Sequence, residues 1–160
     1  MKRLALILLV PLLLVDAADA APLIFIVRHA EKASPGDKDP DLSPEGKKRA
    51  DALARILKDS QITSVFVTEF KRTQETATPT AKAAHLNPTI VSANDIGALV
   101  EKLRASNGNA LVVGHGNTIP DLLKALGIAT PINIPEDDYS EMFAVLLGDA
   151  PQLVRLHYPF

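Results

Sequence analysis

Short apolar runs alternate with stretches of helical periodicity along most of the chain. Runs rich in β-forming residues predict strands buried on both faces of a sheet, at residues 23–27, 64–68 and 110–114. Apolar residues at helical spacing predict helices over about 44–57, 73–84, 96–106 and 118–126. Pro79 is expected to kink or break the second of these helices.

The order of these segments predicts the fold class. Strands that alternate with helices through short links favour an α/β fold, here a three-layer α/β/α sandwich with a mostly parallel central sheet. Residues 89–91 can add a short strand. Runs at 142–147 and 152–158, joined by a turn at 148–149, predict an antiparallel strand pair at the C-terminal end. With 160 residues in all, we expect a single domain over 21–160.

The N-terminal segment differs from the rest of the chain. Lys2 and Arg3 precede an apolar run at 4–15, and small residues follow at Ala18 and Ala20. This order is typical of a secretory signal peptide over 1–20, cut before Ala21. The run is shorter than the roughly 20 residues of a spanning helix, so an uncleaved anchor or a buried helix is less favoured. We therefore expect an exported protein, periplasmic or secreted, with no stable membrane span after cleavage.

Composition excludes several kinds of chemistry. The net charge of −2 argues against nucleic acid as a partner, because such binding needs a basic excess. The chain has no cysteine, which excludes disulfides, thiolate metal sites and a cysteine nucleophile.

Reactive side chains follow three of the predicted buried strands. The first strand ends in Arg28–His29, the second leads to Arg72, and the 110–114 strand is followed by His115. The carboxyl ends of parallel strands meet at one edge of a sheet, where ligands of such folds bind. We therefore expect these two arginines and two histidines to form one site.

This set of residues suits phosphate. Guanidinium groups bind phosphate oxygens at two points, and helix N-termini that follow strands add N–H donors. Asn117 could donate to the same anion or serve only as a turn residue. A neutral imidazole can attack phosphorus with one nitrogen while the other keeps its proton, usually against a backbone carbonyl. His29 is the candidate nucleophile, and Arg28, Arg72 and His115 would stabilise charge on the transferred group.

Four ordered motifs resemble the histidine phosphatase superfamily, the phosphoglycerate mutase-like group, as a small member of branch 1. They lie at Arg28–Glu31, Asp41–Gly46 with Ala50, Thr68–Ala77 and Val112–Thr118. The resemblance implies a phosphorylated His29, with Arg28, Arg72 and His115 completing the phosphate pocket. It also implies a mostly parallel sheet between helices, and neither a metal nor a nucleotide cofactor.

The chain departs from this pattern in two places. Ala30 stands where the family often has glycine, a mild change. The general acid is less clear: Asp95 is one candidate and otherwise a plain helix cap. Glu31 is the alternative acid, and otherwise a loop carboxylate that orients a cation. The family implies that small members acting on protein phosphohistidine can work without a strong acid.

The leading hypothesis is a phosphatase that hydrolyses phosphate monoesters, or a phosphohistidine or phosphoprotein, through a phosphohistidine on His29. The alternative is a non-catalytic phosphate- or phosphoprotein-binding module that keeps the pocket. A metal hydrolase using His29, His115 and carboxylates is disfavoured, since no local ligand pair such as His-Glu-x-x-His occurs. We expect no metal or other cofactor. His85 and His157 are expected to be surface or packing residues, and Tyr139 either borders the site or packs under a loop.

Overall fold

A computed structural model describes residues 21–34 and 36–159 of the chain. The predicted signal peptide, residues 1–20, lies outside the described residues. Within the described part, no helix has the length and apolar character needed to cross a membrane.

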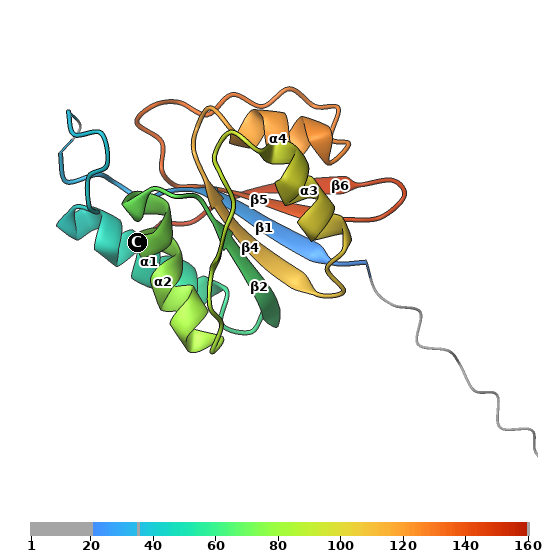
Figure 1. Ribbon diagram of the computed structural model, residues 1–160, viewed down its shortest axis with the longest axis horizontal. Coiled ribbons are helices and arrows are strands. Elements are labelled where there is room, and N and C mark those ends of the chain that lie inside the picture. Colours follow the sequence, from blue (N-terminus) through green and yellow to red (C-terminus); the bar gives the residue numbers. More distant parts are fainter. Residues whose placement is uncertain (1–20, 35, 160) are drawn as a thin grey trace, which may run out of the picture.

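A six-stranded sheet forms the centre of the fold, in the order β3-β2-β4-β1-β5-β6 (Figure 1). The strands are β1 (Leu23–Arg28), β2 (Ile62–Val67), β3 (Thr89–Ile90), β4 (Asn109–Gly114), β5 (Glu141–Leu146) and β6 (Gln152–His157). The helices are α1 (Pro44–Ile56), α2 (Lys71–Ala83), α3 (Ile96–Arg104) and α4 (Ile119–Ala125).

The strand directions confirm the mostly parallel sheet and its antiparallel C-terminal pair. Strand β4 lies parallel to both β1 and β2, and β2 lies parallel to β3. Strand β5 runs antiparallel to β1 and to β6. The carboxyl ends of β1, β2 and β4 therefore lie at the same edge of the sheet, as the site prediction requires.

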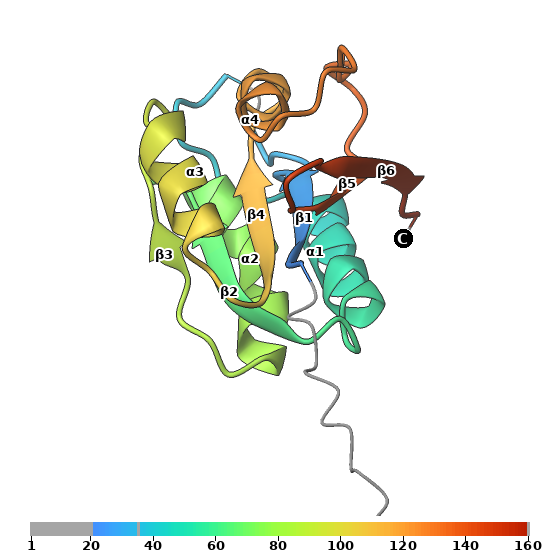
Figure 2. The same cartoon turned by 90° about the vertical axis from the view of Figure 1, so that its right-hand side faces the viewer.

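Helices cover both faces of the sheet, with α1 and α2 on one face and α3 and α4 on the other (Figure 2). Successive residues of β1 pack on opposite faces of the sheet. Ile24 and Ile26 pack in the core under α3 and α4, whereas Phe25 and Val27 pack in the core under α1 and α2. All four are apolar because both faces of this strand are buried.

Helix α2 differs from its prediction. It begins at Lys71 rather than Thr73 and ends at Ala83 rather than Ala84, and it continues through Pro79, where a kink or break was expected. Proline removes one helical hydrogen bond. The buried residues Ala77, Thr80 and Ala81 flank Pro79 and pack this stretch into the structure, which offsets that loss. Helix α2 therefore runs without a break, and it begins beside the carboxyl edge of the sheet.

Helix α1 begins close against the segment that follows β1. The Ser43 side chain accepts a hydrogen bond from the Gly46 N–H and so caps the helix. A side chain at position 46 would collide with the backbone of Glu31, so glycine permits this approach. The contact holds the chain just beyond His29 in place.

Candidate active site

An open cleft of about 880 Å³ lies at the carboxyl edge of the parallel strands. The cleft brings together all four residues on which the site prediction depends, and it includes Asn117. The lining residues are Arg28, His29, Glu31, Lys32, Arg72, His115, Gly116, Asn117, Asn133, Ile134, Glu136 and Tyr139. The rings of His29 and His115 lie 5.4 Å apart between centroids, so both can reach one small anion.

His29 is held by its own backbone and by its neighbour. Its N–H donates to the Gly114 carbonyl, which continues the β1–β4 ladder by one residue. Its ring Nδ1 lies 2.8 Å from the Ala30 carbonyl oxygen. The Ala30 N–H in turn donates to the Thr76 hydroxyl on α2 at 2.9 Å. Helix α2 thereby fixes the peptide that orients the imidazole.

The surroundings keep both histidines neutral. The pKa of His29 is lowered from 6.5 to about 3, chiefly by burial and to a smaller extent by His115, Arg28 and Arg72, against the opposing effect of the Ala30 hydrogen bond. Burial and the Arg72 charge lower the pKa of His115 to about 4, against a smaller opposing effect of Glu69. Because the Ala30 carbonyl can only accept, the proton of neutral His29 resides on Nδ1, and Nε2 keeps its lone pair.

One nitrogen of the Arg28 guanidinium is held by hydrogen bonds, and another has no hydrogen-bond partner among the described residues. Its Nη1 donates to the backbone carbonyls of residues 135, 136 and 138, at 3.0, 2.8 and 3.2 Å. Its guanidinium lies 4.3 Å from the centre of the Tyr139 ring. Its Nε is buried and has no hydrogen-bond partner among the described residues. A buried N–H without a partner is rare, and here it belongs to a residue that lines the cleft.

Arg72, on helix α2, is held in the same way as Arg28. Its Nη1 donates to the Lys38 carbonyl at 3.4 Å and lies 3.9 Å from the Asp39 carboxylate. Its guanidinium lies 4.3 Å from the Phe70 ring centre. Its Nε, like that of Arg28, is buried without a partner within the described part of the chain. The cleft therefore holds two cationic donors that an anion would satisfy.

His115 is oriented by Thr68, the residue after β2, which is itself held by Thr73 in the first turn of α2. Its Nε2 lies 3.1 Å from the Thr68 hydroxyl, which lies 3.0 Å from the hydroxyl of Thr73. All three side chains are buried. The edge of the Phe70 ring packs against the imidazole, with centroids 5.3 Å apart. The sequence placed Thr68 at a strand end, but nothing in it indicated this contact.

The two candidate acids are placed differently. Asp95 caps α3, where its carboxylate accepts from the Ala98 N–H at 2.9 Å, and it lines a separate, mostly apolar cavity under that helix. Glu31 lines the cleft, but three hydrogen bonds from Arg49 occupy both of its oxygens, at 2.7–3.0 Å. The structure thus brings Glu31 to the site and leaves Asp95 outside it.

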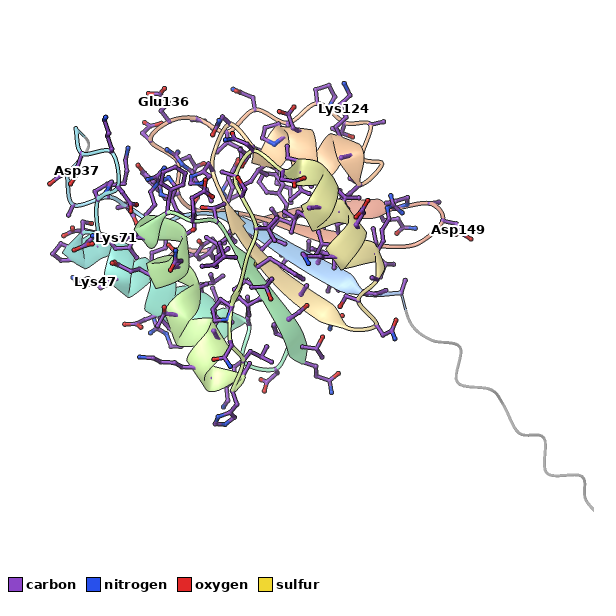
Figure 3. All side chains as sticks on the ribbon, viewed as in Figure 1. Asp37, Lys47, Lys71, Lys124, Glu136 and Asp149 are labelled. Atoms are coloured by element: carbon purple, nitrogen blue, oxygen red, sulfur yellow. The ribbon has the colours of Figure 1, made fainter. Side chains whose placement is uncertain are left out.

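The loop between α4 and β5 supplies backbone contacts that sequence reasoning missed, and it carries Tyr139, which the sequence placed either beside the site or under a loop. Its carbonyls anchor Arg28, and Tyr139 lies 6.0 Å from His29 between ring centroids. Exposed Glu136 stands on the same loop at the cleft rim (Figure 3), at the end of the molecule opposite Asp149. Backbone carbonyls carry no residue-type signal, so only the acidic run before Tyr139 marked this segment.

Comparisons with known proteins agree with this geometry. The sequence model of the histidine phosphatase superfamily (branch 1) matches residues 24–96. A solved structure of the protein histidine phosphatase SixA in complex with tungstate has a TM-score of 0.71 and 22% identity, covering 84% of this chain and 96% of that one. A mycobacterial glucosyl-3-phosphoglycerate phosphatase has a TM-score of 0.66 and 13% identity, covering 86% and 98%. No curated protein sequence matches the chain.

Proposed function

We propose that this chain, whose residues 24–96 match the sequence model of branch 1 of the histidine phosphatase superfamily, hydrolyses phosphorylated substrates through a covalent phosphohistidine on His29. The observation that carries the proposal is the state of that imidazole. It is neutral, its Nδ1 proton is held by the Ala30 carbonyl, and its Nε2 lone pair is available. Such a nitrogen can attack phosphorus without a separate base.

In the first step, Nε2 of His29 forms a bond to phosphorus while the bond from phosphorus to the leaving group breaks. The unpaired Nε groups of Arg28 and Arg72 would donate to the equatorial oxygens, where charge is stabilised during transfer. If the Thr68 hydroxyl donates to Nε2 of His115, the ring proton of His115 sits on Nδ1 and can join them.

In the second step, water attacks the phosphohistidine and the His29–phosphorus bond breaks. The electron pair returns to Nε2, the water loses a proton to solvent or to a nearby base, and inorganic phosphate leaves. The Ala30 carbonyl holds the Nδ1 proton throughout, so the imidazole returns to its starting tautomer.

The same features count against a pocket that only binds phosphate. A binding module gains affinity from every positive charge near a dianion. Here burial keeps two histidines uncharged in the centre of the site. Neutral histidines attract a phosphate dianion less strongly than charged ones would, but a neutral imidazole can act as a nucleophile. The site therefore favours turnover over simple binding.

The carboxylates in the cleft bear on the substrate class. Two carboxylates occur among the described residues that line the cleft: Glu31, which is bound by Arg49, and the exposed Glu136. A site with little acid assistance suits a leaving group that departs readily, such as the imidazole of a phosphohistidine. We therefore favour a phosphohistidine-bearing protein over an alkyl phosphate monoester. The SixA structure named above is described as a protein histidine phosphatase, which is consistent with this preference.

We also propose that the protein acts after export, in the periplasm or outside the cell. The support is the order of basic, apolar and small residues in 1–20. Mass spectrometry of the protein recovered from the envelope or medium should give an N-terminus at Ala21.

Rapid mixing with excess p-nitrophenyl phosphate tests the function. We expect continued release of p-nitrophenol over many turnovers, and none from His29→Ala. A phosphohistidine peptide should be hydrolysed with a higher kcat/KM than glycerol phosphate. Tight phosphate binding without any release would instead support the binding module.

A further inference from the structure

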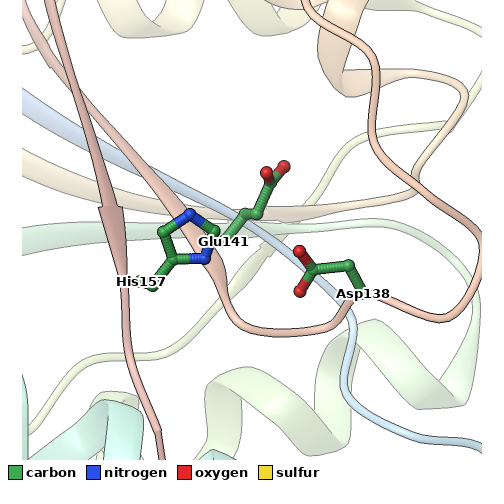
Figure 4. A group of neighbouring side chains, drawn as sticks. All are labelled: Asp138, Glu141 and His157. Atoms are coloured by element: carbon green, nitrogen blue, oxygen red, sulfur yellow. The ribbon is translucent and has the colours of Figure 1, made fainter.

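Three side chains from separate segments converge beside the loop that anchors Arg28. Glu141 is the first residue of β5 and His157 is the last of β6, and the two are direct cross-strand partners. Asp138 approaches them from the end of the loop before β5 (Figure 4). Each residue offers one ligand atom, and these atoms all lie within 4.8 Å of one another.

Glu141 is the unusual member of this group. Its side chain is 3% exposed, and one carboxylate oxygen contacts the guanidinium of Arg155. The other oxygen, Oε2, is buried and has no hydrogen-bond partner among the described residues. A buried carboxylate oxygen without a partner is costly, so this position calls for a positive or donating group.

The local charge favours a cation. Asp138 and Glu141 bring two carboxylates, Arg155 brings one positive charge, and a metal-bound histidine is neutral. The charge of Arg49, which also acts on Asp138, is paired with Glu31. Ser140 links the other two members, because its hydroxyl donates to Asp138 at 2.8 Å and lies 3.0 Å from Nδ1 of His157. Such outer contacts orient metal ligands in many proteins.

We propose that Asp138, Glu141 and His157 bind a divalent transition-metal ion of the Zn²⁺ type. One nitrogen and two oxygen donors match this class, whereas Ca²⁺ and Mg²⁺ take oxygen ligands alone. Three protein ligands leave a position for water, which suits the exposed His157 at the surface. The sequence predicted no metal because the ligands come from a loop and two strand ends rather than a local pair.

The site is distinct from the catalytic cleft, whose lining contains none of the three ligands. It is joined to the cleft through the backbone, since the Asp138 carbonyl accepts from Nη1 of Arg28 and Tyr139 follows directly. A bound ion would therefore stabilise the segment that positions Arg28, without touching the transferred phosphoryl group.

Isothermal titration of the purified protein with ZnCl₂ tests this site. The protein should carry no polyhistidine tag and should be stripped with EDTA beforehand. We expect one Zn²⁺ per chain, and Zn²⁺ should also raise the Tm, because it binds only the folded state. His157→Ala and Glu141→Gln should each weaken binding at least about tenfold. His85→Asn, which changes an exposed histidine far from the group, should bind as the wild type does.

His157→Ala is the decisive variant, because His157 is exposed and its loss should leave the fold intact, which circular dichroism can check. The proposal is overturned if the wild type binds no Zn²⁺, or if His157→Ala binds it as tightly as the wild type. It is also overturned if His115→Asn abolishes binding while His157→Ala retains it, since the ion would then occupy the catalytic cleft. Binding is measured without substrate, so failure here would leave the proposed phosphatase activity unaffected.

Discussion

The Nδ1 atom of His29 lies 2.8 Å from the carbonyl oxygen of Ala30, the next residue in the chain. A carbonyl can only accept, so this contact selects the tautomer of the imidazole. The Thr76 hydroxyl on α2 holds the same peptide from the other side. The backbone thus orients the proposed nucleophile, and no neighbouring carboxylate is required for this.

We predict that His29 stays neutral, with its proton on Nδ1, throughout the pH range 5–8. The reason is burial, which lowers the pKa of this imidazole to about 3. Long-range ¹H–¹⁵N spectra of the histidine rings distinguish the two tautomers and the charged form. A His29 signal that titrates near the ordinary pKa of about 6.5 would contradict the account.

The same pKa values make the folded state less stable in mild acid. Between pH 6.5 and about 4, the unfolded chain binds protons at His29 and His115 that the folded chain does not. The free energy of unfolding should therefore fall as the pH falls, by up to about 1.4 kcal/mol per pH unit for each histidine. Urea unfolding at pH 7 and pH 5 measures this, and the drop should be smaller in His29→Asn. An equal drop in both proteins would show that His29 is not responsible.

Arg72→Ala should lower kcat/KM by about 10²–10³-fold, the usual effect of losing one preorganised donor. Arg72 lines the cleft and its buried Nε has no partner among the described residues, so in the proposed mechanism it is available to the substrate phosphate. Lys71→Ala is the matched control, because Lys71 is exposed and only pairs with Asp41 at the surface. Steady-state kinetics of both variants check the prediction, which fails if they lose activity equally.

Glu31→Gln should retain kcat within about tenfold, although its Tm should fall because Arg49 loses a charged partner. Removal of a true general acid costs about 10²–10⁴-fold. Asp95→Asn should have still less effect, since asparagine caps a helix as well as aspartate does. One result would contradict this prediction and identify the substituted residue as the general acid. It is a large loss of kcat in either variant, together with loss of the decrease in rate at alkaline pH.

Thr68→Val should lower kcat about tenfold, which corresponds to about 1.4 kcal/mol in the barrier. The change keeps the shape of the side chain but removes the hydroxyl that contacts Nε2 of His115. Thr78→Val on α2 is the control, because the Thr78 hydroxyl bonds only to the Gln74 carbonyl of its own helix. Equal kinetics of Thr68→Val and the wild type would show that His115 needs no such support.

The features of the fold and site that the sequence could predict are those that follow from hydrophobic periodicity and from the residues at strand ends. Apolar runs marked the buried strands, and parallel packing then brought His29, Arg72 and His115 to one edge. Helix α2 was predicted to begin two residues later than it does, at Thr73, and a kink or break was expected at Pro79, because the packing around that proline is not visible in a local pattern.

The contacts that position the site were beyond prediction for a related reason. Arg28 is anchored by backbone carbonyls of a loop more than 100 residues away in the chain, and carbonyls are the same in every residue. Glu31 pairs with Arg49 on α1, which no local spacing indicates. The sequence is compatible with Asp95 either as a helix cap or as the general acid. Only the fold distinguishes the two, because it places Asp95 at the start of α3 and outside the cleft.

The most direct test of the account is to trap the covalent intermediate. The protein is mixed with ³²P-labelled substrate, quenched in alkali, digested and sequenced by mass spectrometry. We predict a phosphoryl group on His29 that survives alkali and is lost in acid, and no labelling of His29→Asn. An acid-stable adduct, or label on any residue other than His29, would contradict the central claim.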